Sequence, residues 1–211
     1  SSIMIGDTTT GTIDAANYNT GLGVNVFEDL TTGDNNVAVG FDALKNTTTG
    51  TQNVSIGMNS LVTNVTGSNN IAVGTSALYN STGGNNTAVG HGTLSANTSA
   101  ANNVAVGFNA LNDNTTGSEN TAVGANSLDA NTTGVKNSAF GTAALGDNTT
   151  GDFNTAVGRQ ALKFNTTADN NTAVGYQALQ VNTTGANNTA VGASAGDAIT
   201  TGSESVALGS N

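Results

Sequence analysis

Residues 176–192 read Tyr-Gln-Ala-Leu-Gln-Val-Asn-Thr-Thr-Gly-Ala-Asn-Asn-Thr-Ala-Val-Gly, and variants of this 17-residue unit fill the chain. The glycine that closes the unit recurs every 17 residues, except for one interval of 16 between Gly74 and Gly90. Self-similarity at a fixed period is typical of solenoids, in which each repeat forms one rung that stacks on the next. The repeat therefore predicts a single repeat domain over residues 1–211.

The composition excludes several classes of protein. The net charge of −10, from 4 basic and 14 acidic residues, has the wrong sign for a nucleic-acid groove. The chain has no cysteine for disulfides or thiolate metal sites, and no apolar run that predicts membrane insertion. Glycine does not recur at every third position, which excludes collagen. We expect no nucleic-acid partner, no membrane insertion and no cofactor.

Short strands explain the rung better than helices do. Asn, Thr and Gly are poor helix formers, and no apolar set recurs at helical spacing. Two strands of about four to six residues per rung are expected, one around Ala178-Leu179 and one at Thr189-Ala190-Val191. Because side chains alternate along a strand, Val191 and Leu179 are assigned to the core and Ala190 to the outward face.

Two residue types are expected to shape the turns. The closing glycine follows an apolar residue, which predicts a positive φ at which a side chain would clash. The structural-turn glycines are Gly40, Gly57, Gly74, Gly90, Gly107, Gly124, Gly158, Gly175 and Gly192. An asparagine four residues before the closing glycine predicts a stacked amide ladder. Its members are Asn36, Asn53, Asn70, Asn86, Asn103, Asn120, Asn137, Asn154, Asn171 and Asn188.

Rungs that close on themselves stack their strands in parallel, about 4.8 Å apart. The glycines predict an all-β parallel solenoid of about twelve to thirteen rungs. One Val, one Leu and a few small residues bury little apolar surface against the entropy of ordering 17 residues. The outward alanine face is therefore expected to pack against other copies of the chain, most simply in a homotrimer.

The titratable residues do not form a catalytic or metal-binding pattern. His91 is the single histidine, and it follows Gly90 at a place that is Phe41 or Arg159 in other rungs. Without a second histidine or any cysteine, one chain cannot supply a zinc site or a nucleophile constellation. Asp113, Asp129 and the other carboxylates occupy different phases of the rung, so no acid and base pair is predicted. We expect no catalytic, cofactor-binding or metal residues.

The phrase Asn120-Thr121-Ala122-Val123-Gly124 resembles the Asn-Ser-Val-Ala-Ile-Gly repeats in the heads of trimeric autotransporter adhesins. The longer unit at 171–179, Asn-Thr-Ala-Val-Gly-Tyr-Gln-Ala-Leu, is similar to repeats of phage tail-fibre proteins. The likeness covers essentially the full chain. It implies a left-handed parallel β-roll, assembled as a homotrimer, that attaches to a cell surface or spaces a binding tip from an anchor. Rungs of adhesin heads are shorter, which leaves the cross-section of this rung open.

Together these features predict a non-enzymatic segment of a larger fibre, from a phage tail fibre or an adhesin, at the virion surface or outside the cell. A cell-surface glycan or protein receptor would be its partner. The aromatic side chains of Tyr79, Phe153, Phe164 and Tyr176 fit receptor contacts and packing between protomers equally well. The alternative is a stand-alone ice-binding or carbohydrate-binding solenoid, because Asn-Thr-Thr-Gly stretches such as 131–134 stack threonines at a turn. As turn residues, these asparagines need no role as glycosylation acceptors.

Overall fold

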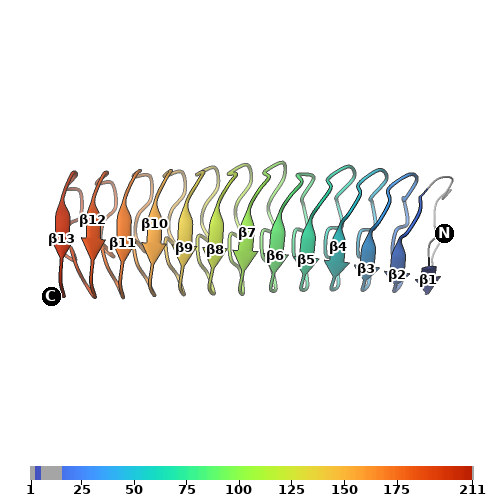
Figure 1. Ribbon diagram of the computed structural model, residues 1–211, viewed down its shortest axis with the longest axis horizontal. Helices are drawn as coiled ribbons and strands as arrows, with labels where there is room; N and C mark the ends of the chain where they lie inside the picture. Colours follow the sequence, from blue (N-terminus) through green and yellow to red (C-terminus); the bar gives the residue numbers. More distant parts are fainter. Residues whose placement is uncertain (1–2, 6–15, 211) are drawn as a thin grey trace. The chain divides into compact units, whose positions relative to one another are not determined.

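The computed structural model describes residues 3–5 and 16–210. The chain divides into two compact units, Ser1–Asn103 and Val104–Asn211. The first unit contains strands β1 (Ile3–Ile5), β2 (Thr20–Leu22), β3 (Val37–Val39), β4 (Val54–Ile56), β5 (Ile71–Val73) and β6 (Thr87–Val89) (Figure 1). The second unit contains β7 (Val104–Val106), β8 (Thr121–Val123), β9 (Ser138–Phe140), β10 (Thr155–Val157), β11 (Thr172–Val174), β12 (Thr189–Val191) and β13 (Val206–Leu208).

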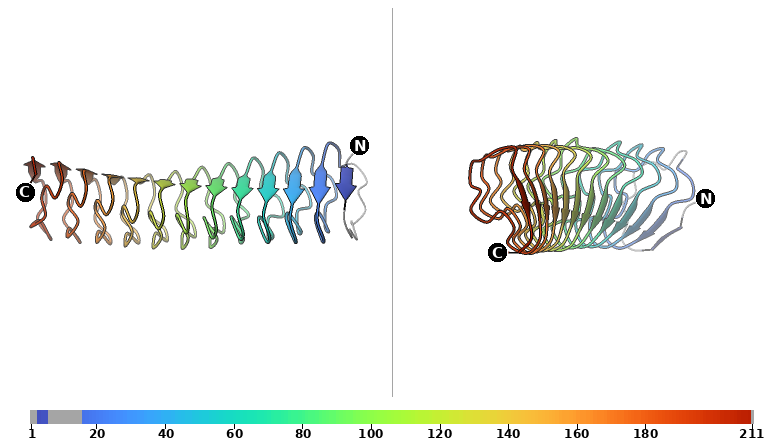
Figure 2. Two further views of the ribbon diagram at one scale, coloured as in Figure 1. Left: turned by 90° about the horizontal axis from the view of Figure 1, so that it is seen from below. Right: turned by 60° about the vertical axis from the view of Figure 1, so that its left-hand side comes forward.

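Within each unit, every strand pairs in parallel with the next strand along the chain. The register is that of the repeat, so that Ala156 lies opposite Ala139 on one side and Ala173 on the other. Figure 2 shows that a loop follows each strand and brings the chain back to the next strand, which lies beside the first. An all-β parallel solenoid with a 17-residue turn is confirmed, and no described residue lies in a helix.

The described residues contain about eleven turns, slightly fewer than the twelve to thirteen predicted. Gly6, which stands 17 residues before Gly23 and also belongs to the 17-residue glycine period, lies outside the described residues. A single repeat domain over residues 1–211 stays a prediction, as do the left-handed course and the homotrimer.

The prediction of two strands per turn is wrong, because each turn has one strand of three residues. The Leu-bearing segment is a coiled turn in which every second residue is left-handed, as at Asn126 (φ 53°) and Leu128 (φ 50°). This segment still stacks, since Leu128 N–H donates to Ala144 O and Ala130 N–H to Gly146 O of the next turn. A left-handed leucine costs about 1–2 kcal/mol, which full burial of its side chain offsets by about 1.5–3 kcal/mol.

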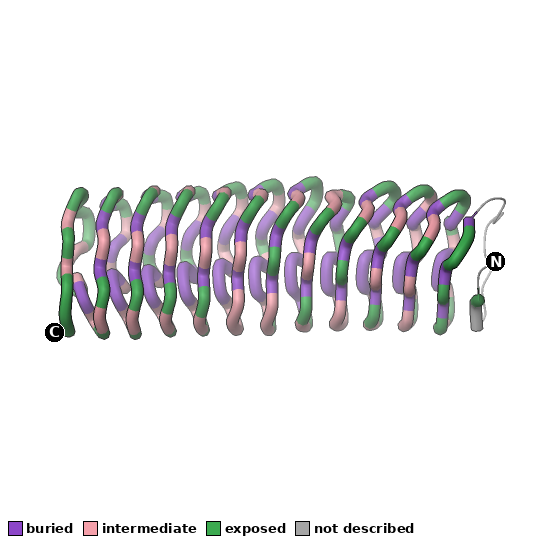
Figure 3. The backbone as a smooth tube through the Cα atoms, viewed as in Figure 1, coloured by how far each residue is buried: buried purple, intermediate pink, exposed green. Residues whose placement is uncertain are grey.

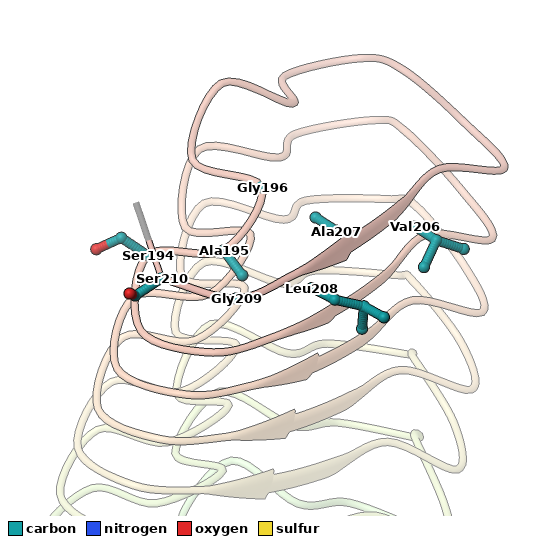
Figure 4. A pocket seen from close by; sticks show the side chains of 8 residues that line it. All are labelled: Ser194, Ala195, Gly196, Val206, Ala207, Leu208, Gly209 and Ser210. Carbon is teal, nitrogen blue, oxygen red and sulfur yellow. The ribbon is translucent and has the colours of Figure 1, made fainter.

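The predicted direction of the strand side chains is also wrong. In β2 to β12 the middle residue points into the turn, and Ala156, Ala173 and the other alanines at this place are fully buried. Val157 and Val191 point outward and are 38% and 43% exposed. Figure 4 shows the same arrangement in the last turn, where Ala207 points inward while Val206 and Leu208 point away. Buried and more exposed residues therefore alternate along the strands (Figure 3).

The narrow interior explains why alanine, and not valine, occupies the inward position. The strand residue faces the buried leucine of the opposite wall, and together they fill the space. Where Phe27 replaces the leucine, Gly21 replaces the alanine. A Cβ added to Gly21 would lie 2.9 Å from Val26 Cγ1 and 3.2 Å from Phe27 Cδ2. In the turn that contains β4, a hydrogen bond from the Ser55 hydroxyl to Ser60 O joins the strand to the opposite side of the turn.

Two substitutions in one strand test this orientation. Ala156→Val should destabilise the protein by about 1–3 kcal/mol, because added methyl groups overpack a filled interior. Val157→Ala should cost less than about 1 kcal/mol, because that side chain is already partly in water. Chemical denaturation of the two variants compares the free energies of unfolding. A larger loss for Val157→Ala than for Ala156→Val would contradict the orientation.

Candidate binding surface

The nine predicted turn glycines all have positive φ, between 131° for Gly192 and 141° for Gly175. They form a corner after each strand where successive turns approach closely. At Gly124, with φ of 138°, an added Cβ would lie 2.6 Å from both Gly141 C and Gly141 O in the next turn. Both the backbone conformation and the contact therefore favour glycine at this corner.

The asparagines four residues before the closing glycine link consecutive turns. The Asn137 backbone N–H donates to Asn120 Oδ1 over 2.9 Å, and Asn137 Nδ2 donates to the same oxygen over 3.2 Å. Asn137 Nδ2 also donates to Gly151 O over 2.8 Å. All ten predicted members of this ladder are buried. The ladder satisfies buried polar groups inside the solenoid, so its amides are not available to a ligand.

A second buried ladder was missed by the sequence analysis. Asn131 Nδ2 donates to Asn114 Oδ1 over 2.8 Å, and Asn148 Nδ2 donates to Asn131 Oδ1 over 2.9 Å. These asparagines begin the Asn-Thr-Thr stretches, and their constant place seven residues after the closing glycine was the available signal. The ladder ends at Asn182, whose buried Oδ1 has no donor because Ile199 occupies the equivalent place in the next turn.

The burial of this second ladder bears on two interpretations of the Asn-Thr-Thr stretches. The Asn131 amide is fully buried and hydrogen-bonded, so it does not present a glycosylation acceptor at the surface. The first threonine of each stretch directs its hydroxyl to a carbonyl of the next turn, as Thr132 Oγ1 does to Thr149 O over 3.0 Å. In the second unit the same bond is made by Thr115, Thr132, Thr149, Thr166 and Thr183. These hydroxyls join successive turns, and the ice-binding alternative stays a prediction.

In the described part of the chain, titratable groups do not gather into a metal site. Across residues 3–5 and 16–210, no three His, Asp or Glu side chains are placed to hold a metal ion. The side chain of Asp129 is half-buried, and this burial raises the pKa of its carboxyl group. The nearby carboxylates of Asp147 and Asp113 raise that pKa further.

The raised pKa of Asp129 predicts a pH-dependent stability. The folded protein binds this proton more tightly than the unfolded chain, so stability falls as the pH rises from the ordinary value of 3.8 through the raised value. Asp129→Asn should therefore raise Tm at pH 7 and leave Tm unchanged near pH 3. Glu119→Gln, which removes an equal charge from an exposed side chain, is the control. A lower Tm for Asp129→Asn at pH 7 would contradict the assignment.

The aromatic side chains named from the sequence lie at different places on the turn. Tyr79, Phe153, Phe164 and Tyr176 are 36%, 51%, 37% and 47% exposed. In the second unit, each of these rings contacts a cation. Lys136 Nζ lies 5.3 Å from the centroid of Phe153, Lys163 Nζ 4.5 Å from that of Phe164, and the guanidinium carbon of Arg159 5.7 Å from that of Tyr176.

The outward residues of the strands form a surface without charge. We call this surface the outer strand face: it consists of the first and third residue of each strand. In the second unit these are Val104, Val106, Thr121, Val123, Ser138, Phe140, Thr155, Val157, Thr172, Val174, Thr189, Val191, Val206 and Leu208. The chain carries a net charge of −10, so the absence of any acidic residue from these positions distinguishes this face from the rest of the surface.

A hollow opens over the last turn and is lined by residues 194–196 and 206–210 (Figure 4). Its floor includes Ala195 and Ala207, at places that the following turn covers elsewhere in the unit. No charged side chain lines it. The hollow is therefore the open side of a turn and has no polar constellation that could orient a ligand.

Comparison with known proteins identified no matching family model, curated protein or solved structure. None of the described residues forms a helix with the length and apolar character needed to cross a bilayer.

Proposed function

We propose that the chain is a structural segment of a trimeric attachment protein, of the phage tail-fibre or adhesin type, which spaces and displays a receptor-binding region at the virion surface or outside the cell. The proposal rests on one observation: the buried polar side chains form hydrogen bonds between successive turns. The two amide ladders join turn to turn, as Asn137 to Asn120 and Asn131 to Asn114. Such a chain builds a regular scaffold, and this role requires no catalytic group or cofactor.

The homotrimer in this proposal is supported by the outer strand face and no longer by an alanine face. Residues such as Val157, Val174 and Val191 leave apolar surface in water on successive turns. Two chains with a net charge of −10 repel each other, so contact is most favourable where charged side chains are absent. Identical turns then repeat the same contact, and many weak contacts add to a stable assembly. A left-handed course of each chain belongs to the same proposal.

Cysteine cross-linking tests this interface, because the native sequence has no cysteine. Val174→Cys places a thiol on the outer strand face, and three copies of it would approach one another in the trimer. Oxidation should then give a disulfide-linked pair of chains on a non-reducing gel. Thr167→Cys, at an exposed turn position, is the matched control and should remain a single chain. Cross-linking of Thr167→Cys but not of Val174→Cys would contradict the proposed interface.

A further inference from the structure

One pair of successive turns in the second unit carries a polar and aromatic group of side chains just after the corner glycine. Arg159 and Tyr176 occupy equivalent places one turn apart, as do Gln160 and Gln177. Arg159 Nη1 lies 3.4 Å from the Tyr176 hydroxyl, and Gln177 Nε2 donates to Gln160 Oε1 over 3.2 Å. The four side chains form two stacked pairs that follow one another directly along the chain.

The neighbouring turns leave the Arg159 and Tyr176 pair open. The equivalent place is Thr142 in the preceding turn and Ala193 in the following turn, and both side chains are small. Tyr176 is 47% exposed, and Arg159 is also exposed. The planar ring and the guanidinium group therefore stand above shorter neighbours, where a ligand can approach the ring.

The charge of Arg159 is not neutralised by a carboxylate. Among the described residues Arg159 forms no ion pair, whereas Lys45 pairs with Glu28 and Asp42. In the second unit, the two places that follow each corner glycine hold no acidic residue. A guanidinium group has five N–H donors; Arg159 stacks on the Tyr176 ring and uses one of these donors, at Nη1, for the Tyr176 hydroxyl. Arg159 thus remains able to bind a carboxylate, the group that its planar geometry fits best.

We propose that Arg159, Gln160, Tyr176 and Gln177 bind a carboxylated sugar, such as a uronic or sialic acid residue of a surface glycan. The sugar carboxylate would pair with Arg159, and the apolar face of the pyranose ring would lie on Tyr176. The amides of Gln160 and Gln177 supply both donors and acceptors for the sugar hydroxyl groups. This inference rests on the proposed attachment function and names the chemical class of its ligand.

The test is an NMR titration of the intact chain with four probes. Methyl β-glucuronide and the methyl glycoside of N-acetylneuraminic acid carry the carboxylate, methyl β-glucoside lacks it, and acetate lacks the ring. At least one of the two acidic glycosides should bind at least about tenfold more tightly than both glucoside and acetate, since hydrogen bonds to charged groups are the stronger ones. Arg159→Gln and Tyr176→Ala should each weaken its binding about tenfold or more without lowering Tm.

Lys136→Gln combined with Phe153→Ala is the matched control, because it removes another cation and ring pair from the same unit. This double variant should bind the acidic glycosides as the wild type does. Equal binding of acidic and neutral glycosides, equal binding of acetate, no binding of any probe, or unchanged binding by Arg159→Gln would each overturn the inference. A wild type that is trimeric but binds none of the probes would contradict this binding site alone. A monomeric wild type would contradict the proposed assembly.

Discussion

Gly124→Ala is expected to lower the free energy of unfolding by more than about 3 kcal/mol, because two separate costs add at this corner. Gly124 has φ of 138°, a conformation that residues with a Cβ rarely adopt. The added methyl carbon would also lie 2.6 Å from Gly141 C and O and 3.0 Å from Thr142 N. These are backbone atoms of the next turn, so relief requires the turns to separate. Denaturant unfolding followed by circular dichroism measures the loss.

Gly146→Ala is the matched control for this prediction. It adds the same methyl group one turn further along, where the nearest atoms, Ala143 O and Asp129 Oδ1, are 3.4 Å away. The control should change stability by less than about 1 kcal/mol. Equal stability of Gly124→Ala and Gly146→Ala would show that the corner does not require glycine.

Asn137→Ala is expected to cost about 3 kcal/mol or more, since it removes several buried hydrogen bonds and leaves the buried Asn154 backbone N–H without its acceptor. Gly151 O loses one of its two side-chain donors, Asn137 Nδ2, and keeps the other, Asn148 Nδ2. The backbone N–H and Nδ2 of Asn154 both lose their acceptor, Asn137 Oδ1. Asn137 is fully buried, so water cannot replace its lost hydrogen bonds unless the turn opens.

The control for the ladder is Thr150→Ala, which truncates an exposed side chain at another part of the turn. Thermal unfolding of both variants should show a large fall in Tm for Asn137→Ala and little change for Thr150→Ala. Equal Tm values for the two variants would contradict a structural role for the ladder.

The period, the corner glycines and the phase of the first ladder could be predicted because they recur in the sequence itself. The orientation of the strand could not. Alternation shows that Ala190 and Val191 point to opposite faces, but it does not show which face is inside. Which residue points inward depends on how much space the interior leaves beside the strand, and the leucine on the opposite side of the turn already fills most of that space. The paired change to Gly21 and Phe27 was the one sequence signal of that width.

The left-handed leucines could not be predicted either, because isolated residues with a Cβ disfavour that conformation. At Leu128 and Leu145, hydrogen bonds to the next turn and complete burial override the local preference. The second ladder was missed for a related reason, since asparagine in Asn-Thr-Thr also suits an exposed turn. The stacking of Arg159 on Tyr176 depends on which residues occupy equivalent places in successive turns, and it becomes visible once the register is known.

The molecular mass in solution tests the central claim most directly. Light scattering on the purified chain should give three times the 20.7 kDa of one chain, at concentrations low enough to exclude non-specific association. Circular dichroism on the same sample should show β structure and cooperative unfolding. A mass of 20.7 kDa for a chain that is folded by this criterion would contradict the homotrimer.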